Sequence, residues 1–223
     1  MKFDKIVIAI PHSVGKTDFS NWDRPEVAEA DSDKWTDWFT DKLFTPPRKD
    51  GVVAVVGSVP RFDCDLERLA NDPLESVGRG ILYRTSHSGA RRLDSGEHLL
   101  QHWHDYRKAI VAELTPNSLL VDCHSFPSDI SDVDICIGVN NDWSSPDKVT
   151  LDTVLEHFCD YKVAINDPFH GSLTPEAGFP YTSLMIEVNK RLCLNEDTLT
   201  ESAFAYKIYN AICSLYGKLL KLP

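Results

Sequence analysis

The sequence lacks an apolar run long enough to cross a membrane or to form the core of a signal peptide. The first apolar run covers only residues 6–10 and follows an acidic residue, Asp4, whereas a membrane-spanning helix needs about 20 predominantly apolar residues. The apolar stretch of a secretory signal is also longer than this run. We therefore expect a cytoplasmic protein without a membrane partner.

Positive charge is scarce. Lysine and arginine together number 23, against 34 aspartate and glutamate residues, so the formal net charge is −11. Nucleic acids and anionic membranes both need a basic surface for binding. We therefore expect neither as a partner, although a few local arginines can still bind a small anion inside a pocket.

Two further patterns are absent from the sequence. The six cysteines are spread along the chain without a C-x-x-C pair, which argues against a structural zinc ribbon and favours buried free thiols. A Gly-x-Ser-x-Gly elbow is also missing, and no corresponding cysteine motif replaces it. A serine or cysteine amidase is therefore a weak alternative for this chain.

The hydrophobic pattern alternates between strands and helices. Short apolar runs rich in β-branched residues predict strands at residues 5–10, 52–57, 118–123, 133–138, 161–165 and 182–188. Helical spacing of apolar residues predicts helices at residues 33–44, 95–114, 149–159 and 198–220. We expect an α/β fold of three layers, α/β/α, with a mixed, mainly parallel central sheet. Without a linker or repeat, residues 1–223 are expected to form one domain.

Polar side chains follow two of the predicted strands where each strand should end. His12 comes just after the run at 6–10, and Asp122, His124 and Ser125 close the run that begins at Leu119. Ligands of open α/β sheets bind at the carboxyl ends of strands, and imidazole is the commonest metal ligand in proteins. The pattern predicts a divalent metal held between the two histidines.

Two carboxylates are placed to complete such a site. Asp37 lies near the start of the predicted helix that runs to Phe44, and Glu187 lies within an apolar strand. Two histidines and one carboxylate form a catalytic type of zinc site, which leaves one position open for water. A further carboxylate beside that water would serve as the general base.

Each of these residues also has an ordinary structural explanation. His12 could close the loop after its strand, and Asp37 could satisfy amides at a helix start, where acids are favoured. Asp122 could orient a histidine rather than bind the metal. Glu187 could form an ion pair with a basic neighbour, because an unpaired acid in an apolar strand is costly.

A series of short motifs occurs in one order over most of the chain. They are Pro11-His12-Ser13, Asp37-Trp38, Arg61 to Arg68, Asp105-Tyr106-Arg107, Asp122-x-His124-Ser125, Asn166 to Gly171, and Ile186-Glu187-Val188-Asn189. In this order they resemble the N-formylglutamate amidohydrolase family. These zinc hydrolases are similar in fold to zinc carboxypeptidases and aspartoacylases, and the resemblance implies that fold here.

The resemblance also implies roles for the metal-binding residues. His12 and His124 would bind one zinc ion per chain, with Asp37 as the third ligand. Glu187 would be the base that takes a proton from the metal-activated water.

On the substrate side, the resemblance implies that Arg61 and Arg68 clamp a carboxylate, since a guanidinium can donate two parallel hydrogen bonds to it. Arg61 would also polarise the scissile carbonyl. Tyr106, Ser125 and Asn189 would complete the substrate site. Ordinary ion pairs between the two arginines and the acids around them are the alternative.

Some positions depart from the family pattern. Glu67 replaces an asparagine before the second arginine, Arg107 replaces a histidine, Lys190 stands where an arginine would follow Asn189, and Ser172 replaces a glycine. These changes affect the expected substrate more than the metal centre.

Taken together, we expect a zinc-dependent hydrolase that cleaves the amide bond of a small anionic N-acyl amino acid, such as N-formylglutamate, or of a short peptide. The alternatives are a non-catalytic metal- or ligand-binding protein that retains the fold, and a peptidase similar to the zinc carboxypeptidases. The sequence indicates no oligomeric state.

Overall fold

The computed structural model describes residues 3–15, 17–48 and 50–222. Six strands form one sheet in the order β2-β1-β3-β6-β4-β5. Their bounds are β1 (Lys5–Ile10), β2 (Val52–Val56), β3 (Ser118–Phe126), β4 (Ile135–Gly138), β5 (Val163–Ile165) and β6 (Thr182–Asn189). All six predicted strands are confirmed, with small differences at their ends.

The sheet is mixed and mainly parallel, as the sequence predicts. Neighbouring strands run parallel except β6 and β4, which are antiparallel. The two central strands, β3 and β6, are buried at every position. Strands covered on both faces become nearly continuous apolar runs, and this explains why both strands were recognisable in the sequence.

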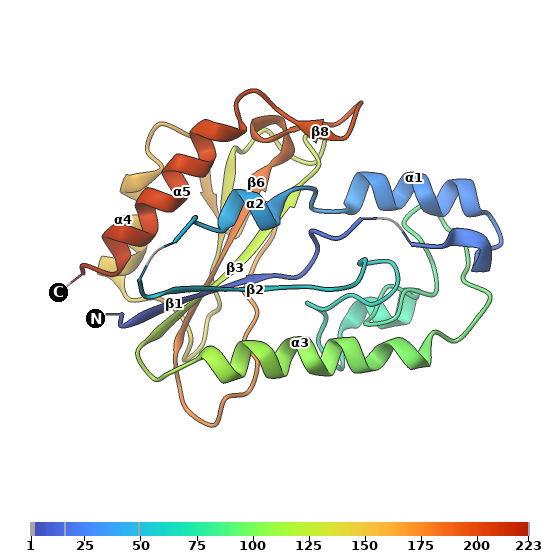
Figure 1. Ribbon diagram of the computed structural model, residues 1–223, viewed down its shortest axis with the longest axis horizontal. Helices are drawn as coiled ribbons and strands as arrows, with labels where there is room; N and C mark the ends of the chain where they lie inside the picture. The colour runs from blue at the N-terminus through green and yellow to red at the C-terminus, as the bar shows by residue number, and fades with distance from the viewer. Residues whose placement is uncertain (1–2, 16, 49, 223) are drawn as a thin grey trace.

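Helices cover both faces of the sheet (Figure 1). On one face lie α2 (Thr40–Phe44), α4 (Lys148–His157) and α5 (Ala205–Leu219), and on the other lies α3 (Leu100–Glu113). Side chains alternate between the faces of a strand, so Ile8 of β1 packs in the core with α5 while Val7 packs in the core with α3. The predicted three-layer α/β fold is therefore confirmed.

The predicted helix at residues 33–44 is wrong in its bounds. Helix α1 (Pro25–Trp35) ends early, and α2 begins only at Thr40. Between them the backbone of Thr36 is extended and Phe39 has a positive φ of 64°, a conformation that a helix cannot continue through. The backbone amide of Asp37 donates a hydrogen bond to the carbonyl of His12 at 3.0 Å, so the break attaches this segment to the end of β1.

The remaining elements are short. They are the 3-10 helices η1 (Phe19–Asn21), η2 (Pro73–Val77), η3 (Glu97–Leu99) and η4 (Lys190–Leu192), and the strands β7 (Leu194–Asn195) and β8 (Thr200–Glu201). Strands β7 and β8 form an antiparallel pair, and β8 lies within the first part of the helix predicted at 198–220. That helix begins only at Ala205.

A third apolar cluster lies outside the two faces of the sheet. It joins α1 and η1 to the long segment before α3, and its buried members are Phe19, Trp22, Ala28, Phe62, Tyr83 and Ala90. Figure 1 shows these segments gathered beyond the ends of β1 and β2, on the side where α1 lies. These segments therefore lie beside the carboxyl ends of β1 and β2.

Two expectations about the whole chain can be compared with the structure. Among the described residues, which include all six cysteines, there is no disulfide bond. Within residues 3–15, 17–48 and 50–222, none of the helices has the length and apolar character needed to cross a bilayer.

Helix α5 should depend on its buried face for docking. Ile212 is fully buried, whereas Tyr206 on the same helix is 72% exposed. We expect Ile212→Ala to lower the free energy of unfolding by about 2–5 kcal/mol and Tyr206→Ala to change it by about 0.5 kcal/mol or less. Urea denaturation measures both, and equal losses in the two variants would contradict this packing.

Candidate metal centre

The two predicted histidines meet at the carboxyl edge of the sheet. His12 follows β1 and His124 lies near the end of β3, and these strands are parallel neighbours with Ala9 opposite Asp122. Parallel strands end at the same edge, so the residues that follow them come together. The two imidazole ring centroids are 5.2 Å apart, and both rings are buried.

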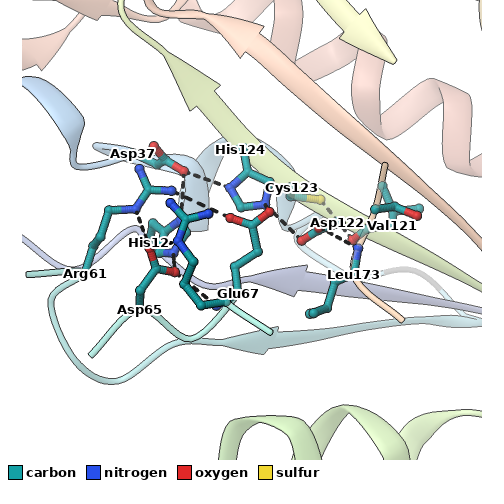
Figure 2. A network of polar contacts seen from close by, with 12 residues as sticks. His12, Asp37, Arg61, Asp65, Glu67, Val121, Asp122, Cys123, His124 and Leu173 are labelled. Atoms are coloured by element: carbon teal, nitrogen blue, oxygen red, sulfur yellow. Dashed lines mark hydrogen bonds and ion pairs between the residues drawn. The ribbon is translucent and has the colours of Figure 1, made fainter. Parts of the chain in front are cut away.

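Asp37 lies between the two imidazole rings (Figure 2). Its Oδ2 atom is 3.1 Å from Nδ1 of His124 and 3.5 Å from Nδ1 of His12. All three side chains are buried, and within the described part of the chain Nδ1 of His12 has no hydrogen-bond partner. Two ring nitrogens and one carboxylate oxygen thus converge on a common point.

A second carboxylate holds each histidine from its opposite side. Nε2 of His12 lies 2.8 Å from Oδ1 of Asp65, and Nε2 of His124 lies 3.0 Å from Oδ1 of Asp122. A metal-binding histidine commonly donates its other ring N–H to a carboxylate in this way. The arrangement leaves Nδ1 of both rings on the side of Asp37.

Asp65 is the residue that sequence analysis missed. It was visible only as one of several acids between Arg61 and Arg68, where a surface ion pair was the simple explanation. The structure buries it completely and places it against His12. For Asp122, the geometry matches the alternative of a residue that orients a histidine, and its Oδ2 is held by the backbone amide of Leu173 at 2.9 Å.

Among the residues that the structure describes, three overlapping groups of side chains have donor atoms close enough to bind one cation. They are His12 with Asp37 and His124, His12 with Asp65 and Glu67, and His124 with Glu67 and Asp122. In the second and third groups the nearest imidazole nitrogen is Nε2, which a carboxylate already engages. The first group is fully buried and offers both Nδ1 atoms, so its donors fit a metal best.

The electrostatics of the centre favour a positive charge. Burial raises the pKa of Asp37, but the adjoining His12 and His124 rings and the charge of Arg61 outweigh this effect and hold the pKa well below its usual value. Burial lowers the pKa of His124, yet the charges of Asp122 and Glu67 raise it well above the usual value. A buried cluster with this excess of carboxylates is stabilised by any cation it can hold.

Glu187 lies next to this group on the adjacent strand. It stands directly opposite His124 in the register of β3 and β6, and it is only 8% exposed. Its Oε2 atom has no hydrogen-bond partner in the part of the chain that the structure describes. The pKa of Glu187 is raised to about 8, mainly by burial; His124 opposes this rise and Asp37 adds to it.

The two basic residues that could have formed an ion pair with Glu187 interact with other groups. Lys190 donates a hydrogen bond to the backbone carbonyl of Lys34, and Arg191 pairs with Asp134 at 2.7 Å. The two basic residues that follow β6 therefore have partners other than Glu187, whose carboxylate lies beside His124.

The two arginines lie beside the centre and engage protein acids. Arg61 pairs with Asp65 at 3.4 Å and with Glu67 at 3.7 Å, and Arg68 pairs with Asp65 at 3.3 Å. Burial raises the pKa of Asp65, but Arg68, His12 and Arg61 together hold it well below its usual value. Both arginines thus lie beside the predicted metal ligands. They form ion pairs with neighbouring acids, which the sequence analysis gave as the alternative to a substrate clamp.

The three remaining predicted substrate residues differ in their placement. Tyr106 of α3 is buried, and burial and Asp122 raise the pKa of its hydroxyl well above the usual value. Ser125 follows His124 on β3 and so points to the opposite face, on the side where Cys123 packs with α5. Asn189 donates both amide hydrogens to the backbone carbonyls of Ser131 and Val133. The substrate contacts expected of Ser125 and Asn189 stay predictions.

Comparisons with known proteins agree with the fold. The family model described as N-formylglutamate amidohydrolase matches residues 4–194 of this chain. The crystal structure of N-formylglutamate amidohydrolase from Ralstonia eutropha JMP134 superposes with a TM-score of 0.79 at 17% identity, covering 99% of this chain and 93% of that one. A search of curated proteins gave no significant match.

More distant structures are also similar to this chain. A variant of murine aminoacylase 3 has a TM-score of 0.46 and 9% identity, with 98% of this chain and 64% of that chain covered. An N-acetylmuramoyl-L-alanine amidase of Nostoc punctiforme has a TM-score of 0.43 and 12% identity, with all of both chains covered.

Metal content provides a direct test of the converging Nδ1 atoms. We expect purified protein supplied with zinc to hold about one ion per chain, and His12→Ala and His124→Ala to lose it because each removes a ligand. His104→Ala serves as the control, because His104 is exposed on α3. Elemental analysis would exclude this site if both ligand variants kept the metal of the wild type.

The carboxylate behind His12 should also influence affinity. We expect Asp65→Asn to weaken zinc binding about 10–100-fold, because an amide orients the imidazole less strongly than a carboxylate. Asp72→Asn is a matched control, since Asp72 also approaches Arg68, at 4.0 Å, without contacting a histidine. Competition with a chromogenic chelator measures both affinities, and unchanged affinity in Asp65→Asn contradicts the orienting role.

Proposed function

Because this chain belongs to the N-formylglutamate amidohydrolase family, we propose that it is a zinc-dependent amidohydrolase acting on small N-acyl amino acids. The observation that carries this proposal is the convergence of two imidazole Nδ1 atoms and one carboxylate oxygen, with a buried glutamate beside them. Residues 4–194 match the family model, and this range includes every residue of the proposed centre.

His12, Asp37 and His124 would hold one zinc ion per chain. Three protein ligands from histidine and carboxylate leave a position open, as catalytic zinc sites do. When bound, zinc lowers the pKa of a coordinated water towards neutrality and polarises a carbonyl oxygen. Asp65 and Asp122 keep the two imidazoles in the required tautomer and orientation.

Glu187 is the proposed general base. Its free Oε2 would accept a proton from the attacking water and then pass that proton to the leaving nitrogen, so that the amine departs neutral. A base transfers protons best when its pKa lies near the working pH, and burial moves the pKa of Glu187 in that direction.

Arg61 is the residue that we propose to polarise the carbonyl of the scissile amide bond. Its guanidinium is almost buried between Asp65 and Glu67, and one nitrogen donates to the backbone carbonyl of Trp35 at 2.9 Å. These contacts fix the direction of the positive charge before a substrate arrives. A preorganised donor stabilises the negative charge that develops on the carbonyl oxygen. The hydroxyl of Tyr106, buried near Asp122, is a further candidate for substrate contact.

We also propose that residues 1–223 act as one catalytic domain. The sheet and both helical layers draw on segments between Lys5 and Leu219, and the centre takes side chains from the ends of β1, β3 and β6. A small molecule is the proposed partner.

A binding protein that only retains the fold is the principal alternative. Glu187 weighs against it, because a buried carboxylate oxygen such as its Oε2, which has no hydrogen-bond partner among the described residues, lowers stability. Metal binding alone needs no such group, since a base is useful only when a proton must move.

Replacement of the base separates binding from chemistry. We expect Glu187→Gln to keep the zinc of the wild type and to lower kcat by at least about a hundredfold, the usual contribution of a positioned base. Glu156→Gln, an exposed change on α4, should retain full activity. Hydrolysis of formyl and acetyl amino acids is followed by amine release, and normal kcat in Glu187→Gln would contradict the assigned role.

The metal route is tested on the same substrates. Chelation should abolish turnover and added zinc should restore it, whereas a serine or cysteine amidase would keep its activity without the metal.

A further inference from the structure

Glu67 is the departure from the family pattern that lies nearest the metal centre. Its Oε1 atom is 3.8 Å from Nε2 of His124, and its Oε2 atom is 3.7 Å from Nη2 of Arg61. The side chain is 26% exposed, so it borders the solvent as well as the centre. Figure 2 shows the carboxylate of Glu67 between Arg61 and His124.

Glu67 occupies the direction in which Arg61 would bind an anionic substrate. One terminal nitrogen of Arg61 already donates to the carbonyl of Trp35, its Nε lies against Asp65, and its other terminal nitrogen faces Glu67. A guanidinium binds a carboxylate best through two parallel hydrogen bonds from one edge. In Arg61, the terminal nitrogen Nη2 that would contribute to such an edge already faces the carboxylate of Glu67.

Arg68 is in a similar position. Its Nε pairs with Asp65 at 3.3 Å, and its Nη1 approaches Asp72 at 4.0 Å. The two arginines that the family pattern assigns to a substrate carboxylate thus face three acids of this chain. Without Glu67, the acids paired with the two guanidinium groups would be Asp65 and Asp72.

The backbone of Glu67 is held from α3. Nη2 of Arg107, a second departure from the family pattern, donates to the carbonyls of Glu67 at 3.1 Å and of Arg68 at 2.8 Å. The guanidinium stacks over Trp103 at 4.3 Å from the ring centroid, and the indole N–H also donates to the carbonyl of Arg68 at 2.8 Å. Glu67 therefore projects from an anchored segment rather than from a free loop.

We propose that Glu67 makes the site select N-acyl amino acids with an uncharged or cationic side chain and disfavour N-acyl dicarboxylates such as N-formylglutamate. This inference rests on the proposed function and narrows its substrate class. A second substrate carboxylate that approaches Arg61 meets the like charge of Glu67, and juxtaposed like charges in a partly desolvated site strongly reduce affinity. A neutral or positive side chain avoids this repulsion.

The test uses two substrates of the same shape, N-formylglutamine and N-formylglutamate, which differ by one negative charge. With zinc-loaded full-length protein, we expect kcat/KM to be at least about tenfold higher for the glutamine derivative. In Glu67→Gln this preference should disappear, mainly because KM for N-formylglutamate falls. Glu113→Gln removes the same charge at the far end of α3, where Glu113 pairs with Lys5, and should keep the wild-type preference.

A binding measurement keeps this inference separate from the proposed hydrolysis. Calorimetry with free glutamine and glutamate on the same zinc-loaded proteins measures charge selection without turnover. If no acyl substrate is cleaved but Glu67→Gln binds glutamate about tenfold more tightly, the hydrolase proposal fails and charge selection by Glu67 stands. The inference is overturned if the preference for the glutamine compound over the glutamate compound, in kcat/KM or in binding affinity, is the same in the wild type and in Glu67→Gln. A matching urea transition for Glu67→Gln confirms that the variant is folded.

Discussion

The contact between each buried imidazole and the carboxylate behind it is the interaction on which the rest of the centre depends. Asp65 engages Nε2 of His12, and Asp122 engages Nε2 of His124. With Nε2 of each ring engaged in this way, Nδ1 of both rings faces Asp37. Buried carboxylates at this density are stable only with compensating positive charge. The carboxylates that orient the histidines therefore also add negative charge, which a bound cation would compensate.

The fold supplies these contacts through strand register and one interrupted helix. Parallel pairing of β1, β3 and β6 places His12, His124 and Glu187 at one edge of the sheet. Asp37 arrives from a different direction, because the chain leaves the helical conformation after Trp35 and bonds to the carbonyl of His12. The two proposed histidine ligands and the proposed base thus lie at the ends of sheet strands. The proposed substrate residue Arg61 and its neighbour Glu67 lie on the longer segments that surround the third apolar cluster.

This division explains where the family pattern is kept and where it changes. The proposed metal ligands and base match it, and His124 and Glu187 stand opposite each other in the register of β3 and β6. Glu67 and Arg107 depart from it together, and the structure shows that the guanidinium of Arg107 holds the backbone carbonyl of Glu67. A change of charge at the rim can alter which anion is accepted without disturbing the buried carboxylate–histidine contacts.

The sequence by itself determined the six strands, the mixed α/β architecture and the pairing of His12 with His124, because period, apolar runs and strand-end residues are local signals. It also identified Glu187, since an acid in an apolar strand stands out. Tertiary structure alone decided the rest. The break before Thr40 depends on a hydrogen bond to His12, and the burial of Asp65 depends on a partner 53 residues away. For Ser125 and Asn189, face and hydrogen-bond partners follow from neighbouring strands and loops. No local pattern records such contacts between distant segments, and only the assembled sheet and its surrounding loops create them.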